Sequence, residues 1–146
     1  MADGVFKIEK IILAPVSKVW CAITDKDEMK QWYFNLTEFK PETGFEFHFT
    51  GGRENGIRYL HNCRITEAEP DKKLTYSWSY EGYAGESFVS FELFPEGNNT
   101  RLVLTHTGLD TFPPDNPDFD KNNFAAGWTQ FIGTSLPAYL ELKSAN

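Results

Sequence analysis

Hydrophobic and polar residues alternate through most of the middle of the chain. Between residues 36 and 107, apolar side chains recur at every second position, which is typical of strands that bury one face. Gly and Asn in the stretch "PEGNN" fit a tight turn between the last two of these strands. Five successive strands with short connections predict an antiparallel meander. The expected strands are 44–50, 56–66, 73–80, 87–94 and 100–107.

The N-terminal part of the chain has a different pattern. Residues 5–13 mostly alternate and are rich in β-branched side chains, so they predict a further strand, which stops at Ala14-Pro15. The stretch "PVSKVWCAI" (15–23) has apolar residues at helical spacing and a proline in its first turn, which predicts a short helix. Asp25 followed by Glu28 resembles a capping box and predicts a second short helix.

The C-terminal stretch from about 122 to 142 carries an apolar stripe at helical spacing. It predicts a long helix that covers one face of the sheet. Pro137 lies inside this stretch and removes a backbone hydrogen bond to the carbonyl of Gly133, so we expect a bend there. If the first strand joins the meander at one edge, residues 1–146 form one α+β domain. Its order is β-α-α-β5-α, with a six-stranded curved antiparallel sheet wrapped around the C-terminal helix.

Composition and charge narrow the possible partners. The formal net charge is -7, which argues against nucleic acid or an anionic membrane as a partner because either requires a basic patch. The two cysteines, Cys21 and Cys63, lack metal-binding spacing, and the N-terminus has no long apolar run. We therefore expect a cytoplasmic protein, either a monomer or a weak homodimer. The chain also contains 13 Phe, 6 Tyr and 4 Trp, more large rings than a minimal core requires.

Four segments together resemble a known family. They are "APVSKVWCAITDKDEMKQW" (14–32), "EAEPDKKLTYSW" (67–78), "TRLVLTHTGL" (100–109) and "GWTQFIGTSLPAYLE" (127–141). These segments are similar to the domain related to the Hsp90 ATPase activator, within the helix-grip (SRPBCC) superfamily that also contains the birch-pollen allergen and the START lipid-transfer domains. The resemblance spans roughly residues 6 to 142, and it implies a cavity between the curved sheet and the long helix, closed at one end by the loop before that helix.

Large aromatic side chains can wall such a cavity without collapsing it, so they are the expected ligand-binding residues. The alternative is that the same side chains pack against one another and leave no pocket. We expect Trp128 mainly to pack in the core, with its outer edge at the cavity mouth. The candidate residues are Trp32, Phe47, Phe49, Tyr59, His61, Tyr76, Trp78, Phe91, His106, Phe112, Trp128, Phe131 and Tyr139.

The loop over residues 108–121 has two interpretations. Prolines at 113, 114 and 117 stiffen it, and Asp118 or Asp120 is placed to cap the following helix. Alternatively, Phe112 and Phe119 form a lid whose rings close over a bound apolar molecule.

The motifs for catalysis and cofactor binding are weak. His61, His106 and Cys63 share an apolar-facing register without the spacing of a metal site, whereas His48 falls on the polar side of its strand. There is no nucleophile elbow, P-loop or dinucleotide fingerprint, and "GGRENG" (51–56) is expected to be a hairpin turn. We expect no metal and no cofactor. Acid-base chemistry stays open for a buried residue, with Tyr59, His61, Tyr76, Tyr80 and His106 as the candidates.

Three functions therefore remain as hypotheses. The preferred one is binding of an unidentified small hydrophobic or aromatic molecule in the cavity. The second, implied by the family resemblance, is a co-chaperone in the stress response that stimulates an Hsp90-type ATPase. The third is a small cavity enzyme of the cyclase or hydrolase kind.

Overall fold

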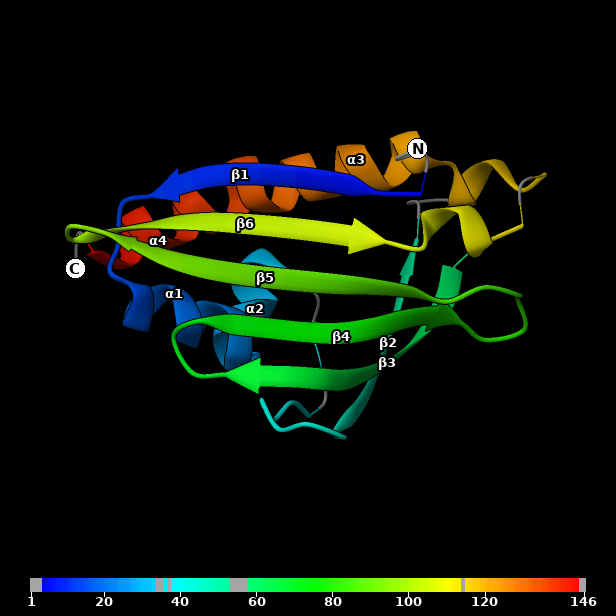
Figure 1. The fold of residues 1–146 in the computed structure, drawn as a ribbon, viewed down its shortest axis with the longest axis horizontal. Coiled ribbons are helices and arrows are strands. Elements are labelled where there is room, and N and C mark those ends of the chain that lie inside the picture. The colour runs from blue at the N-terminus through cyan, green and yellow to red at the C-terminus, as the bar shows by residue number, and fades with distance from the viewer. Residues whose placement is uncertain (1–3, 34–35, 37, 53–57, 114, 145–146) are drawn as a thin grey trace.

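Six antiparallel strands form one curved sheet in a computed structural model that describes residues 4–33, 36, 38–52, 58–113 and 115–144. The strand order is β1-β6-β5-β4-β3-β2, so the first strand pairs with the last and lies at one edge (Figure 1). The predicted sheet is thus confirmed. The strands are β1 (Phe6–Ile12), β2 (Glu46–Gly52), β3 (Arg58–Glu69), β4 (Lys73–Tyr80), β5 (Ser87–Glu96) and β6 (Asn99–Thr107).

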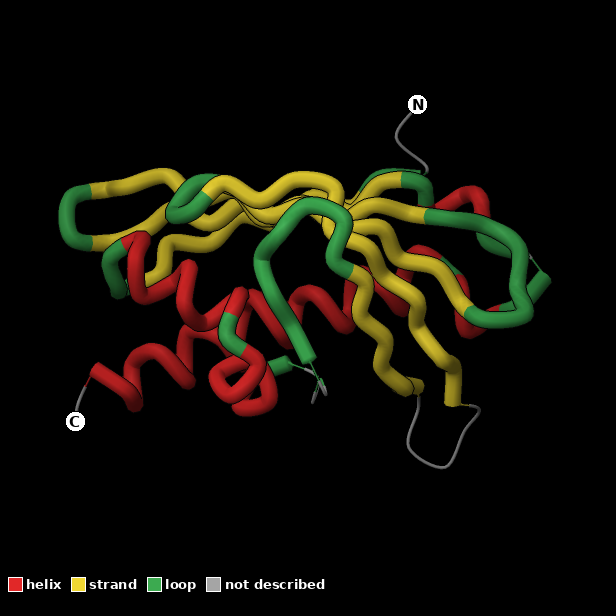
Figure 2. The backbone as a smooth tube through the Cα atoms, turned by 90° about the horizontal axis from the view of Figure 1, so that it is seen from below, coloured by secondary structure: helices red, strands yellow, loops and turns green. Residues whose placement is uncertain are grey.

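One face of the sheet is buried beneath the helices. Alternate residues of β3, such as Tyr59, His61 and Cys63, point toward this face, and Trp78 and Tyr80 do the same from β4. Figure 2 shows the helices on one side of the sheet, with the ends of β2 and β3 bending toward that side. The alternation seen in the sequence therefore marks the concave face. The predicted turn over 51–56 lies mostly outside the described residues.

Two short helices follow β1, as predicted: α1 (Val16–Thr24) and α2 (Lys26–Trp32). Pro15 is the N-cap residue of α1 rather than a residue of its first turn. Asp25 caps α2, because its carboxylate accepts the backbone N–H groups of Asp27 at 2.8 Å and Glu28 at 3.4 Å. The backbone N–H of Asp25 donates to the carbonyl of Cys21, in the last turn of α1.

The predicted long C-terminal helix has three parts: α3 (Lys121–Gln130), the π-helical segment η3 (Phe131–Ser135) and α4 (Leu136–Ser144). The backbone N–H of Leu136 donates to the carbonyl of Phe131, five residues earlier. The irregularity therefore comes just before Pro137 and not at it. Proline has no N–H to donate to Gly133, so a wider turn there sacrifices little. Within the described part of the chain, no helix is long and apolar enough to cross a membrane.

A clasp joins the loop after β4 to the one after β6. The Thr111 hydroxyl, at the end of the 3-10 turn η1 (Leu109–Thr111), accepts the backbone N–H of Glu86 at 2.9 Å. Its one proton faces two carbonyl oxygens, that of Glu86 at 2.9 Å and that of Gly108 at 2.7 Å. Gly85 has a φ of 104°, and a Cβ at this position would lie 2.5 Å from the carbonyl oxygen of Thr111. The clasp therefore requires glycine at residue 85.

Candidate functional site

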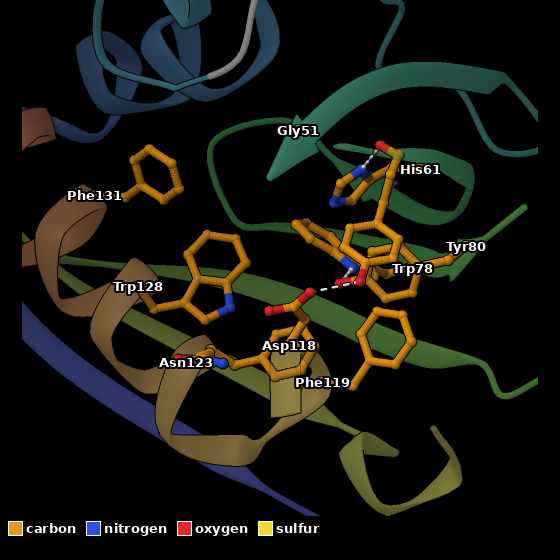
Figure 3. Close-up of a pocket in the computed structure, with 11 residues that line it drawn as sticks. Gly51, His61, Trp78, Tyr80, Asp118, Phe119, Asn123, Trp128 and Phe131 are labelled. Carbon is orange, nitrogen blue, oxygen red and sulfur yellow. Dashed lines mark hydrogen bonds between the residues drawn. The ribbon is translucent and has the colours of Figure 1, made fainter. Parts of the chain in front are cut away.

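A pocket of about 270 Å³ opens between the concave face of the sheet and the start of α3 (Figure 3). One molecule of liquid water occupies about 30 Å³, so the pocket has room for about nine water molecules. Most of its wall consists of aromatic rings, with a few polar groups among them. The lining residues are Gly51, Tyr59, His61, Trp78, Tyr80, Asp118, Phe119, Asn123, Phe124, Trp128 and Phe131.

The sheet side of the pocket follows from strand alternation and register. Tyr59 and His61 are two residues apart on β3, and Trp78 and Tyr80 are two residues apart on β4, so each pair shares a face. His61 lies opposite Tyr80 in the ladder, with ring centroids 4.7 Å apart. His61 also meets the edge of Trp78 at 4.9 Å. The four rings form a continuous wall.

Trp128, on the helix side, is held by a chain of buried hydrogen bonds. Its indole Nε1 donates to His106 Nδ1 at 2.9 Å, and His106 Nε2 lies 2.7 Å from the hydroxyl of Ser87. An indole N–H can only donate, so Nδ1 of His106 is the acceptor and Nε2 carries the proton. The hydroxyl of Ser87 in turn donates a hydrogen bond to the carbonyl of Trp78 at 3.0 Å. The chain fixes the orientation of Trp128 relative to the sheet.

The Ser87–His106 contact is structural rather than catalytic. A general base must accept the serine proton, whereas Nε2 of His106 donates to Ser87 in this arrangement. Both side chains are 0% exposed, and burial lowers the pKa of His106 to about 3. No substrate reaches this pair in the present structure.

His61 is also neutral at pH 7. Its Nδ1 lies 3.0 Å from the carbonyl of Tyr59, which can only accept, so Nδ1 carries the proton. The ring stacks on Phe49 with centroids 4.4 Å apart. Burial lowers the pKa of His61 to about 4. The side chain therefore contributes a polar but uncharged surface to the pocket.

Asp118 and Asp120 have separate roles. The carboxylate of Asp120 accepts the backbone N–H of Asn122 at 2.8 Å and caps α3, which confirms one of the two predicted caps. Asp118, in the 3-10 turn η2 (Pro117–Phe119), instead lines the pocket and accepts a hydrogen bond of 2.6 Å from the hydroxyl of Tyr59. Burial and this hydrogen bond raise the pKa of Tyr59.

The candidate residues from the sequence divide into two groups. Tyr59, His61, Trp78, Trp128 and Phe131 line the pocket. The others pack outside its lining; for example, Trp32 donates from Nε1 to the carbonyl of Ala22 at 2.8 Å, and the hydroxyl of Tyr139 donates to Glu28 at 2.9 Å. This second group consists of Trp32, Phe47, Phe49, Tyr76, Phe91, His106, Phe112 and Tyr139.

Several lining residues were not among the predicted binding residues. Tyr80 continues the alternation of Trp78, and Phe124 belongs to the apolar stripe of the C-terminal helix, so both carried a signal in the sequence. Gly51, Asp118 and Asn123 carried none, because only the folded chain brings them to one cavity. Phe119 entered the sequence analysis only as a lid residue.

Phe112 and Phe119 are packed side chains in this structure, exposed by 3% and 5%. Both rings contact Tyr80, with centroid distances of 5.2 Å and 4.6 Å. Phe119 lines the pocket, whereas Phe112 lies outside its lining. Among the residues that the structure describes, no group of three His, Cys, Asp or Glu side chains is placed to hold a metal ion.

Comparison with known proteins gives one family and many structures. The model of a family described as "Activator of Hsp90 ATPase homolog 1-like protein" matches residues 13–141. A search of curated proteins finds no match.

Two of the similar solved structures cover most of both chains. MLL2253 from Mesorhizobium loti is 26% identical with a TM-score of 0.75, over 94% of this chain and 96% of its own. CalU16 from Micromonospora echinospora is 26% identical with a TM-score of 0.71, over 93% of this chain and 73% of its own.

A third structure belongs to a longer chain. DynU16, a protein of the dynemicin biosynthetic locus, is 27% identical with a TM-score of 0.76 over 95% of this chain. The match covers 48% of DynU16, so the present chain spans about half the length of that protein.

Proposed function

Since this chain belongs to the family of activator of Hsp90 ATPase homolog 1-like proteins and has an aromatic-lined pocket between sheet and helix, we propose that it binds a small hydrophobic or aromatic molecule there. The observation that carries the proposal is the wall of rings from β3, β4 and α3. Ligand sites are typically concave, mostly apolar and provided with a few polar groups.

The size of the pocket limits the ligand. Its volume of about 270 Å³ is close to the lower end of the range of about 300–1,000 Å³ for small-molecule sites. A single or fused aromatic ring with a short substituent suits this space. The similarity to DynU16, a protein of a biosynthetic locus, supports a small-molecule ligand over a macromolecular one.

The four tryptophans allow a direct test, because Trp78 and Trp128 line the pocket whereas Trp20 and Trp32 do not. Unlabelled indole is titrated into ¹⁵N-labelled protein, and the four indole N–H resonances are followed by NMR. We expect the signals of Trp78 and Trp128 to shift in a saturable manner. The signals of Trp20 and Trp32 serve as internal controls and should stay in place.

A pair of phenylalanine variants sharpens the test. Phe131→Ala removes part of the pocket wall and should weaken indole binding by about tenfold, which corresponds to about 1.4 kcal/mol. Phe88→Ala removes a ring that is 38% exposed and outside this pocket, so it should leave the affinity unchanged. Equal shifts at all four tryptophans, or none at any of them, would contradict the proposal.

The description of the family supports a second candidate, stimulation of an Hsp90-type ATPase. The purified protein is added to the Hsp90 of its own host, and the rate of ATP hydrolysis is measured up to saturating concentration. An increase that follows the concentration of the protein supports this candidate. An unchanged rate removes it and leaves the binding proposal untouched.

A further inference from the structure

We propose that the ligand is a small aromatic carbonyl compound, and that its carbonyl oxygen accepts a hydrogen bond from the hydroxyl of Tyr80. This inference rests on the proposed function and names the class of its ligand. Tyr80 then selects among aromatic molecules of similar size, because it favours those that bring a hydrogen-bond acceptor.

The hydroxyl of Tyr80 has a proton to donate. Nε1 of Trp78 lies 2.9 Å from the Tyr80 oxygen, and an indole N–H can only donate, so this oxygen is the acceptor of the bond and keeps its own proton for another partner. Within the part of the chain that the structure describes, no side chain or carbonyl accepts that proton. Tyr80 is 7% exposed and lines the pocket. An acceptor for its proton must therefore come from the contents of the pocket.

The other aromatic donors of the lining are already used within the protein. The hydroxyl of Tyr59 donates to Asp118 at 2.6 Å. The indole N–H of Trp128 donates to His106 at 2.9 Å. Tyr80 is thus the aromatic side chain among the described lining residues whose proton is left for a ligand.

The neighbours of Tyr80 hold it in place before any ligand arrives. Its ring stacks on Phe119 at a centroid distance of 4.6 Å and meets His61 at 4.7 Å and Phe112 at 5.2 Å. Figure 3 shows Tyr80 extending from β4 toward the centre of the lining residues, with its hydroxyl beside the indole of Trp78. Such a preorganised donor loses little conformational entropy when it binds a ligand.

The chemistry of this hydroxyl favours a carbonyl oxygen as its partner. Burial raises the pKa of Tyr80, so the phenol keeps its proton at neutral pH and acts as a donor. The hydrogen bond that it accepts from Trp78 polarises its O–H and strengthens the donation. A ligand without an acceptor would exclude water and leave a buried donor unpaired, which is costly. A carbonyl oxygen only accepts, so it adds no donor that the aromatic wall would leave unpaired.

Two compounds of the same shape separate the hydrogen bond from the burial of the ring. Acetophenone carries a carbonyl oxygen, and α-methylstyrene has a methylene group in the same place. Their affinities are measured at pH 7 from the shifts of the Trp78 and Trp128 indole N–H resonances. Tyr80→Phe removes the hydroxyl and keeps the ring. The affinity for acetophenone relative to that for α-methylstyrene should then fall by about threefold to tenfold, as the loss of one hydrogen bond implies.

Tyr83→Phe is the matched control. It also removes one tyrosine hydroxyl, and the ring of Tyr83 likewise packs against Phe119, with centroids 5.2 Å apart. Tyr83 is 40% exposed and lies outside the pocket lining. The ratio of the two affinities should therefore stay at its wild-type value in this variant.

The hydroxyl is also observed directly in the wild-type protein, because Tyr80→Phe deprives the indole N–H of Trp78 of its acceptor and risks the fold. The tyrosine ζ carbons are labelled with ¹³C, and the Tyr80 resonance is followed by NMR. A phenol that donates a hydrogen bond has its ζ carbon at higher frequency. We expect this resonance at higher frequency with acetophenone bound than with α-methylstyrene bound. The two ligands share one ring, so their ring currents act alike on it.

The outcomes separate this inference from the proposed function. A Tyr80 resonance that responds alike to the two bound compounds would overturn the inference and leave the proposed function standing. An unchanged affinity ratio in folded Tyr80→Phe would do the same. If indole, acetophenone and α-methylstyrene all fail to bind, the proposed function fails, and this inference fails with it.

Discussion

His61 and His106 are both buried and neutral, but they carry their protons on different ring nitrogens. The partner of each ring decides this: a carbonyl, which only accepts, faces Nδ1 of His61, and an indole N–H, which only donates, faces Nδ1 of His106. Both residues therefore hold neighbouring groups in place at neutral pH instead of exchanging protons.

Replacing His106 should destabilise the fold. His106→Leu leaves the indole N–H of Trp128 without its acceptor in a buried site, so we expect a loss of about 2–4 kcal/mol in the free energy of unfolding. Urea denaturation measures this loss. His48→Leu is the control, since His48 is exposed and bonds to Asn62, and it should cost less than about 1 kcal/mol. Equal costs for the two variants would contradict the role assigned to His106.

The free energy of unfolding should also decrease as the pH is lowered from 7 to 5, before the carboxylates titrate. Burial lowers the pKa values of His61 and His106 to about 4 and about 3, below the ordinary value of 6.5. The unfolded chain therefore binds more protons as the pH drops through 6.5, and folding loses stability. Between pH 7 and pH 5, each histidine should contribute a loss of about 1.5–2 kcal/mol. Urea titrations at pH 7, 6 and 5 measure it.

The matched comparison for this pH effect is the His106→Leu protein. It lacks one of the two buried histidines, so its stability should change about half as steeply between pH 7 and pH 5. A slope equal to that of the wild type would show that His106 is not neutral in the folded protein.

The residues of the candidate site were predictable to the extent that a strand or helix pattern points them inward. Tyr59, His61 and Trp78 follow alternation, and Trp128 follows helical spacing. Asp118 was not predictable as a pocket residue, because the rules for helix caps fit it as well as Asp120. Only the contact with Tyr59, 59 residues earlier in the chain, distinguishes the two.

At the scale of elements, the clasp between the β4–β5 loop and η1 holds one end of the pocket. Gly85 lies against Thr111 and also against Phe112, whose ring packs on Tyr80 in the pocket wall. The position of the clasp therefore affects the rings that line the pocket.

Two glycine variants test the clasp. Gly85→Ala places a Cβ 2.5 Å from the carbonyl of Thr111, whereas Gly82→Ala meets open space at a similarly positive φ of 82°. Gly82→Ala should cost about 1–2 kcal/mol for its backbone conformation alone. Gly85→Ala should cost about 1–3 kcal/mol more, because of the added overlap. Urea denaturation compares them, and equal losses would argue against a tight clasp.

Element types were easier to predict from the sequence than their irregularities. Alternation identified the strands because one face of the sheet is buried and the other is not. Pro137 indicated a break in the C-terminal helix, but not its form. The break takes the form of the π-helical segment η3, which precedes the proline. A π-helical turn contains one more residue than an α-helical turn, and the packing of α3 and α4 decides where that wider turn fits.

At the scale of the whole molecule, the net charge of -7 attracts cations and repels anions over long range. Salt screens this field, since the Debye length falls from about 10 Å at 0.1 M to about 3 Å at 1 M.

The architecture was predictable because six strands with short connections leave few arrangements around one long helix. The pocket was not, since its shape depends on which rings fill the core and which stand at its edge. Phe47 and Tyr76 are as aromatic as Trp78, yet they pack against each other at 5.1 Å and lie outside the pocket lining.

The π-helical segment η3 also bears on how proteins of this fold diverge. An α-helix imposes one phase on all its residues, so an insertion or deletion rotates everything beyond it. A five-residue hydrogen-bonded turn can absorb such a change within itself. An insertion or deletion of one residue within η3 can therefore be accommodated without rotating α4 relative to α3.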